Sequence, residues 1–148
     1  MILNQQRAVR LARRPLEHFL RRVQREFGIQ ESGVTIALVS DAEIARMNET
    51  FRKKKGPTDV LSFPAARSRP PSLSRATSKR IADEFLGDIA IAPATARRYA
   101  RKHGRTLPAE LRVLILQGVL HLMGYDHETD RGEMDRIERK LRKRFGLA

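Results

Sequence analysis

The sequence predicts an α/β (α+β) protein: one small β-sheet of about four strands, flanked by about five helices, in a single domain that spans residues 1–148. Composition supports a globular domain, because 41% of the 148 residues are hydrophobic and 32% are charged. A chain of this length can bury a core without disulfides or a structural metal. Periodicity supports the mixture of elements, because short β-branched segments alternate with longer segments of helical period.

The first half of the chain alternates strands and helices. A short strand is expected at the N-terminus. The segment PLEHFLRRVQREFG has one apolar helical face, formed by Leu16, Phe19, Leu20, Val23 and Phe27. The next segment, VTIALV, is typical of a strand. Ser40 and Glu43 have the spacing of a capping box that begins a helix ending near Phe51.

The second half begins with two strands, DVLSF and GDIAIA, predicted from their β-branched and aromatic residues. Between them, residues from about 65 to 80 are rich in Ser, Arg and Pro, which predicts a mobile basic loop. Its role is open between a plain linker and an arm that faces RNA. Three helices follow, from Pro93 to about His103, from Pro108 to about Met123, and from near Asp130 to Phe145. Met134, Ile137, Leu141 and Phe145 form the expected buried stripe of the last helix.

The charge balance favours a polyanionic partner. Lys and Arg number 30 and Asp and Glu number 17, which gives a net charge of +13. Such an excess on a small domain is typical of proteins that bind nucleic acid or an anionic membrane surface. We expect no membrane span, because no apolar run reaches roughly 18 residues. The chain has no cysteine, which excludes a disulfide scaffold and suits a reducing, cytoplasmic location.

One motif, QGVLHLMGYDH at residues 117–127, has the spacing of a metal site. Gln117 and His121 are four residues apart, so a helix places both on one face. Gly124 allows a left-handed turn that can bring His127 back toward them. Metzincin proteases hold zinc in this way, and catalytic zinc needs three protein ligands and an open fourth position. Proteolysis is not expected, because Gly118 stands where H-E-x-x-H has its general base.

The histidines also have a structural interpretation. A histidine in an apolar helix is more often a packed core residue than a metal ligand. His127, which follows the glycine turn, is the observation that favours a ligand role for His121. Asp126 has three open roles: a ligand, a partner that orients an imidazole, or the start of the next helix.

Here the sequence resembles the YbeY family of bacterial endoribonucleases. The family signature H-G-x-L-H-L-x-G-Y-D-H is matched by QGVLHLMGYDH at every specified position except the first. FRKKKGPTDVLSFP, LGDIAIAP and HETDRGEMDRIERKLRKRFG resemble further family segments in the same order. The resemblance runs from about Asn48 to the end of the chain.

The resemblance implies a small mixed sheet flanked by helices and a metal-dependent hydrolase that acts on single-stranded RNA. Members are associated with 3′-end processing of small-subunit ribosomal RNA and with ribosome maturation. The expected partners are therefore RNA and the ribosome or its proteins, with no DNA and no membrane. One Zn²⁺ per chain is expected, with His121 and His127 as ligands.

The resemblance also assigns the family's active-site arginine to Arg52. A guanidinium can hold a phosphate through two parallel hydrogen bonds and stabilise the charge that develops when the phosphodiester is attacked. Lys53, Lys54 and Lys55 are expected to contact the RNA backbone without taking part in chemistry. Asp59 and Asp88 either face the site or are ordinary carboxylates at a turn and a strand.

Gln117 departs from the family, because the signature has histidine there. An amide oxygen is a weaker zinc donor than an imidazole, so Gln117 is at best a weak third ligand. Three interpretations stay open: a metal bound by His121 and His127 with Gln117, Asp126 or water; a degenerate site on a non-catalytic RNA-binding or ribosome-assembly factor; or a sequence variant, since Gln and His codons differ at one base.

Overall fold

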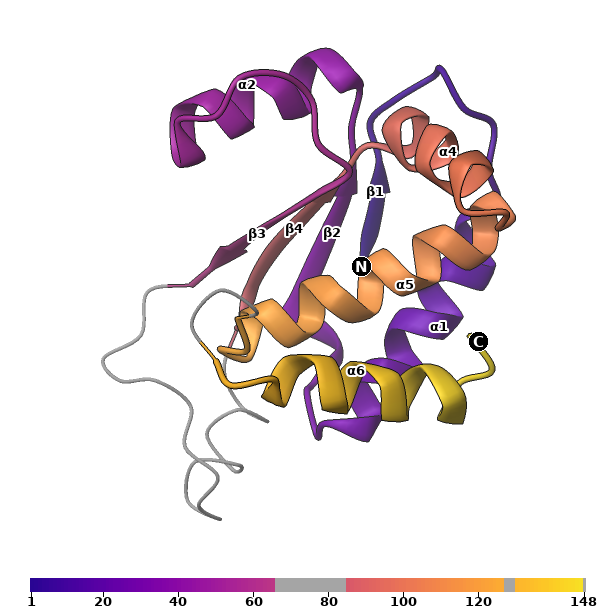
Figure 1. Ribbon diagram of the computed structural model, residues 1–148, viewed down its shortest axis with the longest axis vertical. Coiled ribbons are helices and arrows are strands. Elements are labelled where there is room, and N and C mark those ends of the chain that lie inside the picture. The colour runs from indigo at the N-terminus through magenta and orange to yellow at the C-terminus, as the bar shows by residue number, and fades with distance from the viewer. Residues whose placement is uncertain (66–84, 127–129, 148) are drawn as a thin grey trace.

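The computed structural model describes residues 1–65, 85–126 and 130–147 of the chain. Within them lie one four-stranded sheet and five α-helices, so the predicted fold class is confirmed (Figure 1). The predicted basic loop, at about 65–80, falls almost wholly outside the described residues. In chain order the elements are β1 (Ile2–Asn4), α1 (Arg13–Glu26), a 3-10 turn (Glu31–Gly33), β2 (Val34–Leu38), α2 (Asp41–Arg52), β3 (Val60–Pro64), β4 (Gly87–Ile91), α4 (Pro93–Lys102), α5 (Leu107–Leu122) and α6 (Glu133–Arg144).

The sheet is mixed, as expected. Its strand order is β1-β2-β4-β3, with β1, β2 and β4 parallel and β3 antiparallel to β4. The strand β3 therefore forms one edge of the sheet. Its position matters, because an edge strand can be approached from both faces and from the side.

Register decides which side chains share a face. Ser62 pairs with Ile89, and Phe63 pairs with Asp88. Because successive strand residues alternate between faces, Ser62 and Ile89 point to one side and Phe63 and Asp88 to the other. The first side contacts α5, where the hydroxyl of Ser62 donates to the carbonyl of Gly118 at 3.4 Å. Phe63 on the other side packs in the cluster that contains Ile44 of α2.

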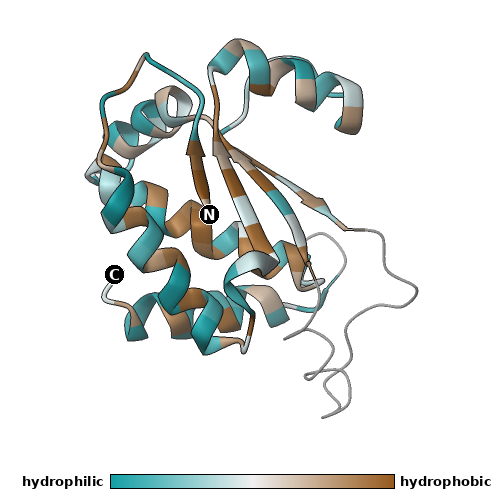
Figure 2. Ribbon diagram, turned by 180° about the vertical axis from the view of Figure 1, so that it is seen from behind, coloured by the Kyte–Doolittle hydropathy of each residue, from teal (hydrophilic) through white to brown (hydrophobic). Residues whose placement is uncertain are grey.

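The helix α5 is the centre of the core. It contacts β3, β4, α1, α4 and α6 (Figure 1), and ten of its 16 residues are buried. A helix that is apolar on every side is stable only when neighbours surround it. Figure 2 shows the corresponding pattern, with hydrophobic residues along the strands and hydrophilic residues on the outer helical surfaces. No helix in the described part of the chain is both long and apolar enough to cross a membrane.

Gly118 sets how closely α5 approaches the sheet. A Cβ atom at this position would lie 2.7 Å from Cδ1 of Ile89 and 3.0 Å from its Cγ2. Separations this short do not occur between packed carbon atoms, so a larger residue would displace the helix or the isoleucine. The glycine of the QGVLHLMGYDH motif therefore has a structural reason.

Most predicted helix ends lie within a few residues of the observed ones. The Oγ atom of Ser40 accepts from the N–H of Glu43 at 3.1 Å, which is half of the expected capping box. The other half is missing, because the Glu43 carboxylate pairs with Arg46. The last helix begins at Glu133, three residues later than expected. Asp130 lies in the preceding turn, where its carboxylate accepts from the N–H of Met134 at 2.8 Å.

Replacement of Gly118 by alanine tests the close approach of α5. We expect Gly118→Ala to lower the free energy of unfolding by about 1–3 kcal/mol through overpacking, partly offset by the better helix propensity of alanine. Because Cδ1 of Ile89 makes the closest contact, adding Ile89→Val should relieve part of the cost. Urea unfolding of the two single variants and the double variant measures this coupling. Strictly additive free energies would contradict the contact.

Candidate active site

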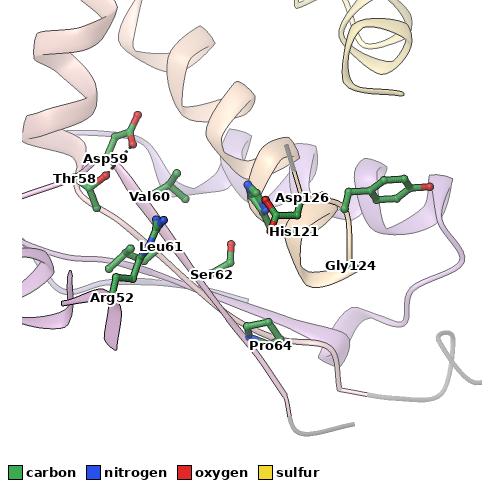
Figure 3. Close-up of a pocket in the computed structure, with 11 residues that line it drawn as sticks. Arg52, Thr58, Asp59, Val60, Leu61, Ser62, Pro64, His121, Gly124 and Asp126 are labelled. Atoms are coloured by element: carbon green, nitrogen blue, oxygen red, sulfur yellow. Dashed lines mark hydrogen bonds between the residues drawn. The ribbon is translucent and has the colours of Figure 1, made fainter. Parts of the chain in front are cut away.

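A cavity of about 630 Å³ lies at the edge of the sheet, between β3 and the end of α5. Its walls come from three parts of the chain (Figure 3). The lining residues are Arg52, Thr58, Asp59, Val60, Leu61, Ser62, Pro64, His121, Gly124, Tyr125 and Asp126. Two segments singled out from the sequence, FRKKKGPTDVLSFP and the QGVLHLMGYDH motif, thus meet in one cavity.

Arg52 reaches this cavity from α2, across the sheet edge from α5. It is the last residue of α2, and Lys53 ends the helix in the left-handed conformation, with a φ of 56°. Lys53, Lys54 and Lys55 are exposed and do not line the cavity. Of the four predicted RNA-binding cations, Arg52 alone is a wall residue, while the lysines lie on the surface beside it.

His121 comes from the last turn of α5 and is partly exposed. Beyond it, the N–H of Gly124 donates to the carbonyl of His121 at 3.0 Å, and the N–H of Tyr125 donates to that of Leu120 at 3.1 Å. This pair of bonds is the Schellman ending, which requires the positive φ of 99° found at Gly124. The turn predicted from the sequence is therefore present, and it places Tyr125 and Asp126 in the wall of the cavity. His127 lies outside the described residues.

Gln117 points toward α6 and is not among the residues that line the cavity. Its Nε2 donates to Oε1 of Glu138 at 2.6 Å. Glu138 is buried, with 5% of its surface exposed, and the same oxygen accepts from Nη2 of Arg142 at 3.2 Å. The amide of Gln117 is thus oriented by a carboxylate 21 residues further along the chain.

Asp59 is the acidic side chain at the opposite end of the cavity from Asp126 (Figure 3). Burial raises the pKa of Asp59 above its ordinary value of 3.8, although hydrogen bonds from the N–H groups of Asp59 and Val60 oppose the shift. A carboxyl group that binds its proton more tightly than usual, inside a cavity with an arginine, is typical of a functional site. Asp88, the other carboxylate considered from the sequence, is exposed on the far face of the sheet.

The donors near the cavity suit a divalent cation. His121 offers an imidazole and Asp126 offers a carboxylate. Gln117, one helical turn before His121, offers its amide oxygen, because its amide nitrogen donates to Glu138. Nitrogen and oxygen donors of this kind bind zinc and harder divalent ions. Among the described residues, which omit His127, no three His, Cys, Asp or Glu side chains gather closely enough to hold an ion.

A family model described as endoribonuclease YbeY matches residues 1–146. The chain belongs to the YbeY family. The endoribonuclease YbeY of Solibacter usitatus is 43% identical over 142 residues, which cover 95% of this chain and 85% of that protein. The endoribonuclease YbeY of Koribacter versatilis is 39% identical over 147 residues, covering 99% and 86%. A Thermotoga maritima protein solved in solution has 29% identity and a TM-score of 0.57, covering 95% of this chain and 85% of that one.

Three polar residues in the cavity wall of this YbeY chain were not predicted from the sequence. Thr58, Ser62 and Tyr125 line the cavity, and the hydroxyl of Thr58 donates to Oδ1 of Asp59 at 3.4 Å. A signal for Ser62 existed, because a serine inside the apolar strand DVLSF marks a position that is not fully enclosed. Nothing in the sequence placed β3 beside α5, which is what makes these residues neighbours of His121.

The contact between Gln117 and Glu138 predicts a loss of stability when Glu138 is removed. We expect Glu138→Ala to lower the free energy of unfolding by about 1–3 kcal/mol, because Gln117 and Arg142 lose a shared, buried acceptor. The control is Asp135→Ala on the same helix, whose exposed pair with Arg139 should contribute less than about 1 kcal/mol. Chemical denaturation of both variants measures the difference. Equal losses would rule out a special role for the buried carboxylate.

The raised pKa of Asp59 predicts a pH-dependent stability change. The folded chain binds the Asp59 proton more tightly than the unfolded chain, so ionisation of this group opposes folding above its folded pKa. We expect Asp59→Asn to raise the free energy of unfolding near neutral pH. The gain should shrink as the pH falls through the folded pKa of Asp59 toward 3.8, its ordinary value.

Asp41 provides a control of opposite sign. Burial acts to raise the pKa of Asp41, but hydrogen bonds from Thr95 at 2.7 Å and Arg98 at 2.9 Å outweigh it, and the net shift is downward. Asp41→Asn should therefore lower stability near neutral pH, and this loss should shrink as the pH falls below 3.8. Urea unfolding from about pH 2 to pH 7 compares the two variants. A pH-independent effect of Asp59→Asn would mean that its carboxyl is not perturbed by burial.

Proposed function

We propose that this chain is a metal-dependent endoribonuclease that cleaves single-stranded RNA in the cavity between β3 and α5. The observation that carries the proposal is that Arg52 and His121, from helices on opposite faces of the sheet, line one cavity together with Asp59. Membership of a family whose curated relatives are named endoribonucleases supports the reaction type. The net charge of +13 supports a polyanionic substrate.

Within this proposal Arg52 binds the scissile phosphate. A guanidinium donates two parallel hydrogen bonds to phosphate oxygens and stabilises negative charge that grows during attack. Its position at the end of α2, where the backbone turns away, leaves the guanidinium accessible to a ligand in the cavity. Lys53, Lys54 and Lys55 contact flanking phosphates and make binding salt-dependent.

Asp59 is the proposed group for proton exchange. A proton acceptor works best when its pKa lies closer to the operating pH than an ordinary carboxylate allows. Burial shifts the pKa of Asp59 in that direction. The carboxyl lies in the same cavity as Arg52, so it can exchange a proton with an attacking or leaving oxygen of the phosphodiester held there.

His121 and His127 are the proposed metal ligands, with Asp126 or Gln117 as a weaker oxygen donor. Glu138 supports this role for Gln117, since a carboxylate that accepts a hydrogen bond from a ligand side chain is the usual way to orient it. One Zn²⁺ per chain would supply Lewis-acid stabilisation and a water activated at neutral pH. The family resemblance extends the proposal to small-subunit ribosomal RNA as substrate, to the ribosome or its proteins as partners, and to the cytoplasm.

A second candidate is a non-catalytic RNA-binding or ribosome-assembly factor on the same fold. The replacement of the family's first histidine by Gln117 favours it, because an amide oxygen is a weaker zinc donor than an imidazole and this side chain does not line the cavity. In that case His121 and Arg52 would serve RNA binding alone.

Two variants test the proposed catalysis. Gln117→His should tighten zinc binding and raise ribonuclease activity, because an imidazole is a better zinc donor than an amide oxygen. Arg52→Ala should lower kcat by about 100- to 1000-fold, the usual effect of removing one group that stabilises a developing oxyanion. The measurements are a zinc titration and cleavage of a single-stranded RNA.

Metal content per chain, measured by mass spectrometry on protein purified without chelator, distinguishes the two candidates. About one zinc per wild-type chain, lost in His121→Ala, is expected for the enzyme. No metal in either protein, together with no gain in zinc affinity or activity from Gln117→His, would overturn the catalytic proposal in favour of the RNA-binding factor.

A further inference from the structure

Phe51 is an exposed aromatic side chain that directly precedes Arg52, a residue of the cavity wall. It is 66% exposed, which is more than any other large hydrophobic residue in the described part of the chain. Along α2 it follows Ile44 and Met47 at helical spacing, and both of those pack against the sheet. Phe51 continues the same stripe at the edge strand β3, where no element in the described part of the chain covers most of its ring. A single exposed hydrophobic residue is ordinary, so its surroundings decide whether it has a role.

The ring of Phe51 is supported on one side. It packs against the ring of Phe63 in an edge-to-face arrangement, with centroids 5.1 Å apart and planes at 74°. Phe63 is itself packed in the cluster between α2 and the sheet. The support restricts the rotation of Phe51 while most of its surface stays in solvent. A rigid, exposed aromatic surface is what a planar ligand needs for stacking.

The neighbours of Phe51 are cations. Arg52 lines the cavity, and the exposed residues Lys53, Lys54 and Lys55 follow it directly. The left-handed conformation of Lys53 ends the helix here, and Nδ2 of the buried Asn48 donates to the carbonyl of Gly56 at 3.0 Å. The lysine segment is therefore tied back to α2 at both ends. The aromatic side chain and the cations are therefore held in a fixed arrangement on the surface. This arrangement reduces the conformational entropy that is lost when a ligand binds.

We propose that Phe51 is a stacking platform for a nucleobase of single-stranded RNA whose phosphate is held by Arg52. The inference rests on the proposed function and adds a binding residue to it. Sites for single-stranded nucleic acid combine a positively charged track for the backbone with aromatic side chains on which bases stack. Phe51 and the four cations after it provide both components within five consecutive residues. A base inside a duplex is already stacked on both faces, so this platform favours unpaired RNA.

A protein partner at the same surface is the competing occupant. Protein interfaces are enriched in aromatic residues and arginine but depleted in lysine, especially at their centre. Three consecutive exposed lysines beside Phe51 therefore favour the polyanion.

A tryptophan reporter tests stacking directly. The chain has no tryptophan, so Phe51→Trp provides a single fluorophore at the proposed platform. The probe is a single-stranded RNA of about eight nucleotides, in EDTA so that cleavage plays no part. Stacking should quench the fluorescence. The same oligonucleotide with abasic sites keeps the phosphates but has no bases, and it should bind without quenching.

Affinity provides the second measurement. Phe51→Ala should weaken binding of the intact oligonucleotide by about 5- to 150-fold, and Phe51→Tyr should restore it, because loss of one stacked base has an effect of this size. The control is Tyr99→Ala, which removes a 39% exposed aromatic residue from α4, away from the cavity. It should leave the affinity unchanged. Thermal unfolding checks that each variant is folded.

The outcomes separate this inference from the proposed function. If wild-type protein binds the RNA but Phe51→Ala and Tyr99→Ala bind equally well, stacking on Phe51 is overturned and a protein contact becomes the better explanation of its exposure. If wild-type protein does not bind RNA at all, the proposed function fails together with the inference. Quenching by intact RNA alone, with weakened binding of Phe51→Ala, supports both.

Discussion

The approach of α5 to β4 at Gly118 fixes the geometry on which the candidate site depends. Because no Cβ atom intervenes, the helix packs directly on Ile89, and its rotation about its own axis is set by that contact. One residue earlier Gln117 faces α6, and three residues later His121 reaches the cavity. The position that holds the general-base glutamate in zinc proteases is here Gly118, where a Cβ atom would already lie 2.7 Å from Cδ1 of Ile89.

The edge position of β3 is the second constraint. A central strand would be covered on both faces and would separate α2 from α5. At the edge, the end of α2 and the end of α5 approach the same strand from opposite faces, so that Arg52 and His121 meet in one cavity. The left-handed turn at Lys53 and the Schellman ending at Gly124 stop both helices there. Each helix thus delivers its last turn, and not its middle, to the site.

Local sequence signals predicted the helices and strands. The long-range contacts between these elements could not be predicted in this way. Apolar periodicity and capping residues gave the helices and strands to within a few residues, because these patterns act over one or two turns. The beginning of α6 was placed three residues too early, because Asp130 lies in the preceding turn while its carboxylate accepts from the N–H of Met134 in the first turn of the helix. No local pattern distinguishes Asp59, which lines the cavity, from Asp88, which is exposed on the face of the sheet away from α5. The partner of Gln117 lies 21 residues away, beyond the reach of any local pattern. The roles of Arg52, His121, His127 and the lysines stay predictions.

The contact with Glu138 changes how the departure at Gln117 is understood. A buried carboxylate requires a donor from its neighbour, and the amide of glutamine supplies one. The ring N–H of a histidine supplies one as well, so either residue satisfies Glu138, whereas an apolar residue would not. A polar side chain at position 117 therefore adds a second donor to the one from Arg142, whether or not a metal binds. It follows that the contact with Glu138 does not distinguish an enzyme from a degenerate relative. The distinction rests on the side chains that face the cavity, among which His121 offers the imidazole and Arg52 the guanidinium.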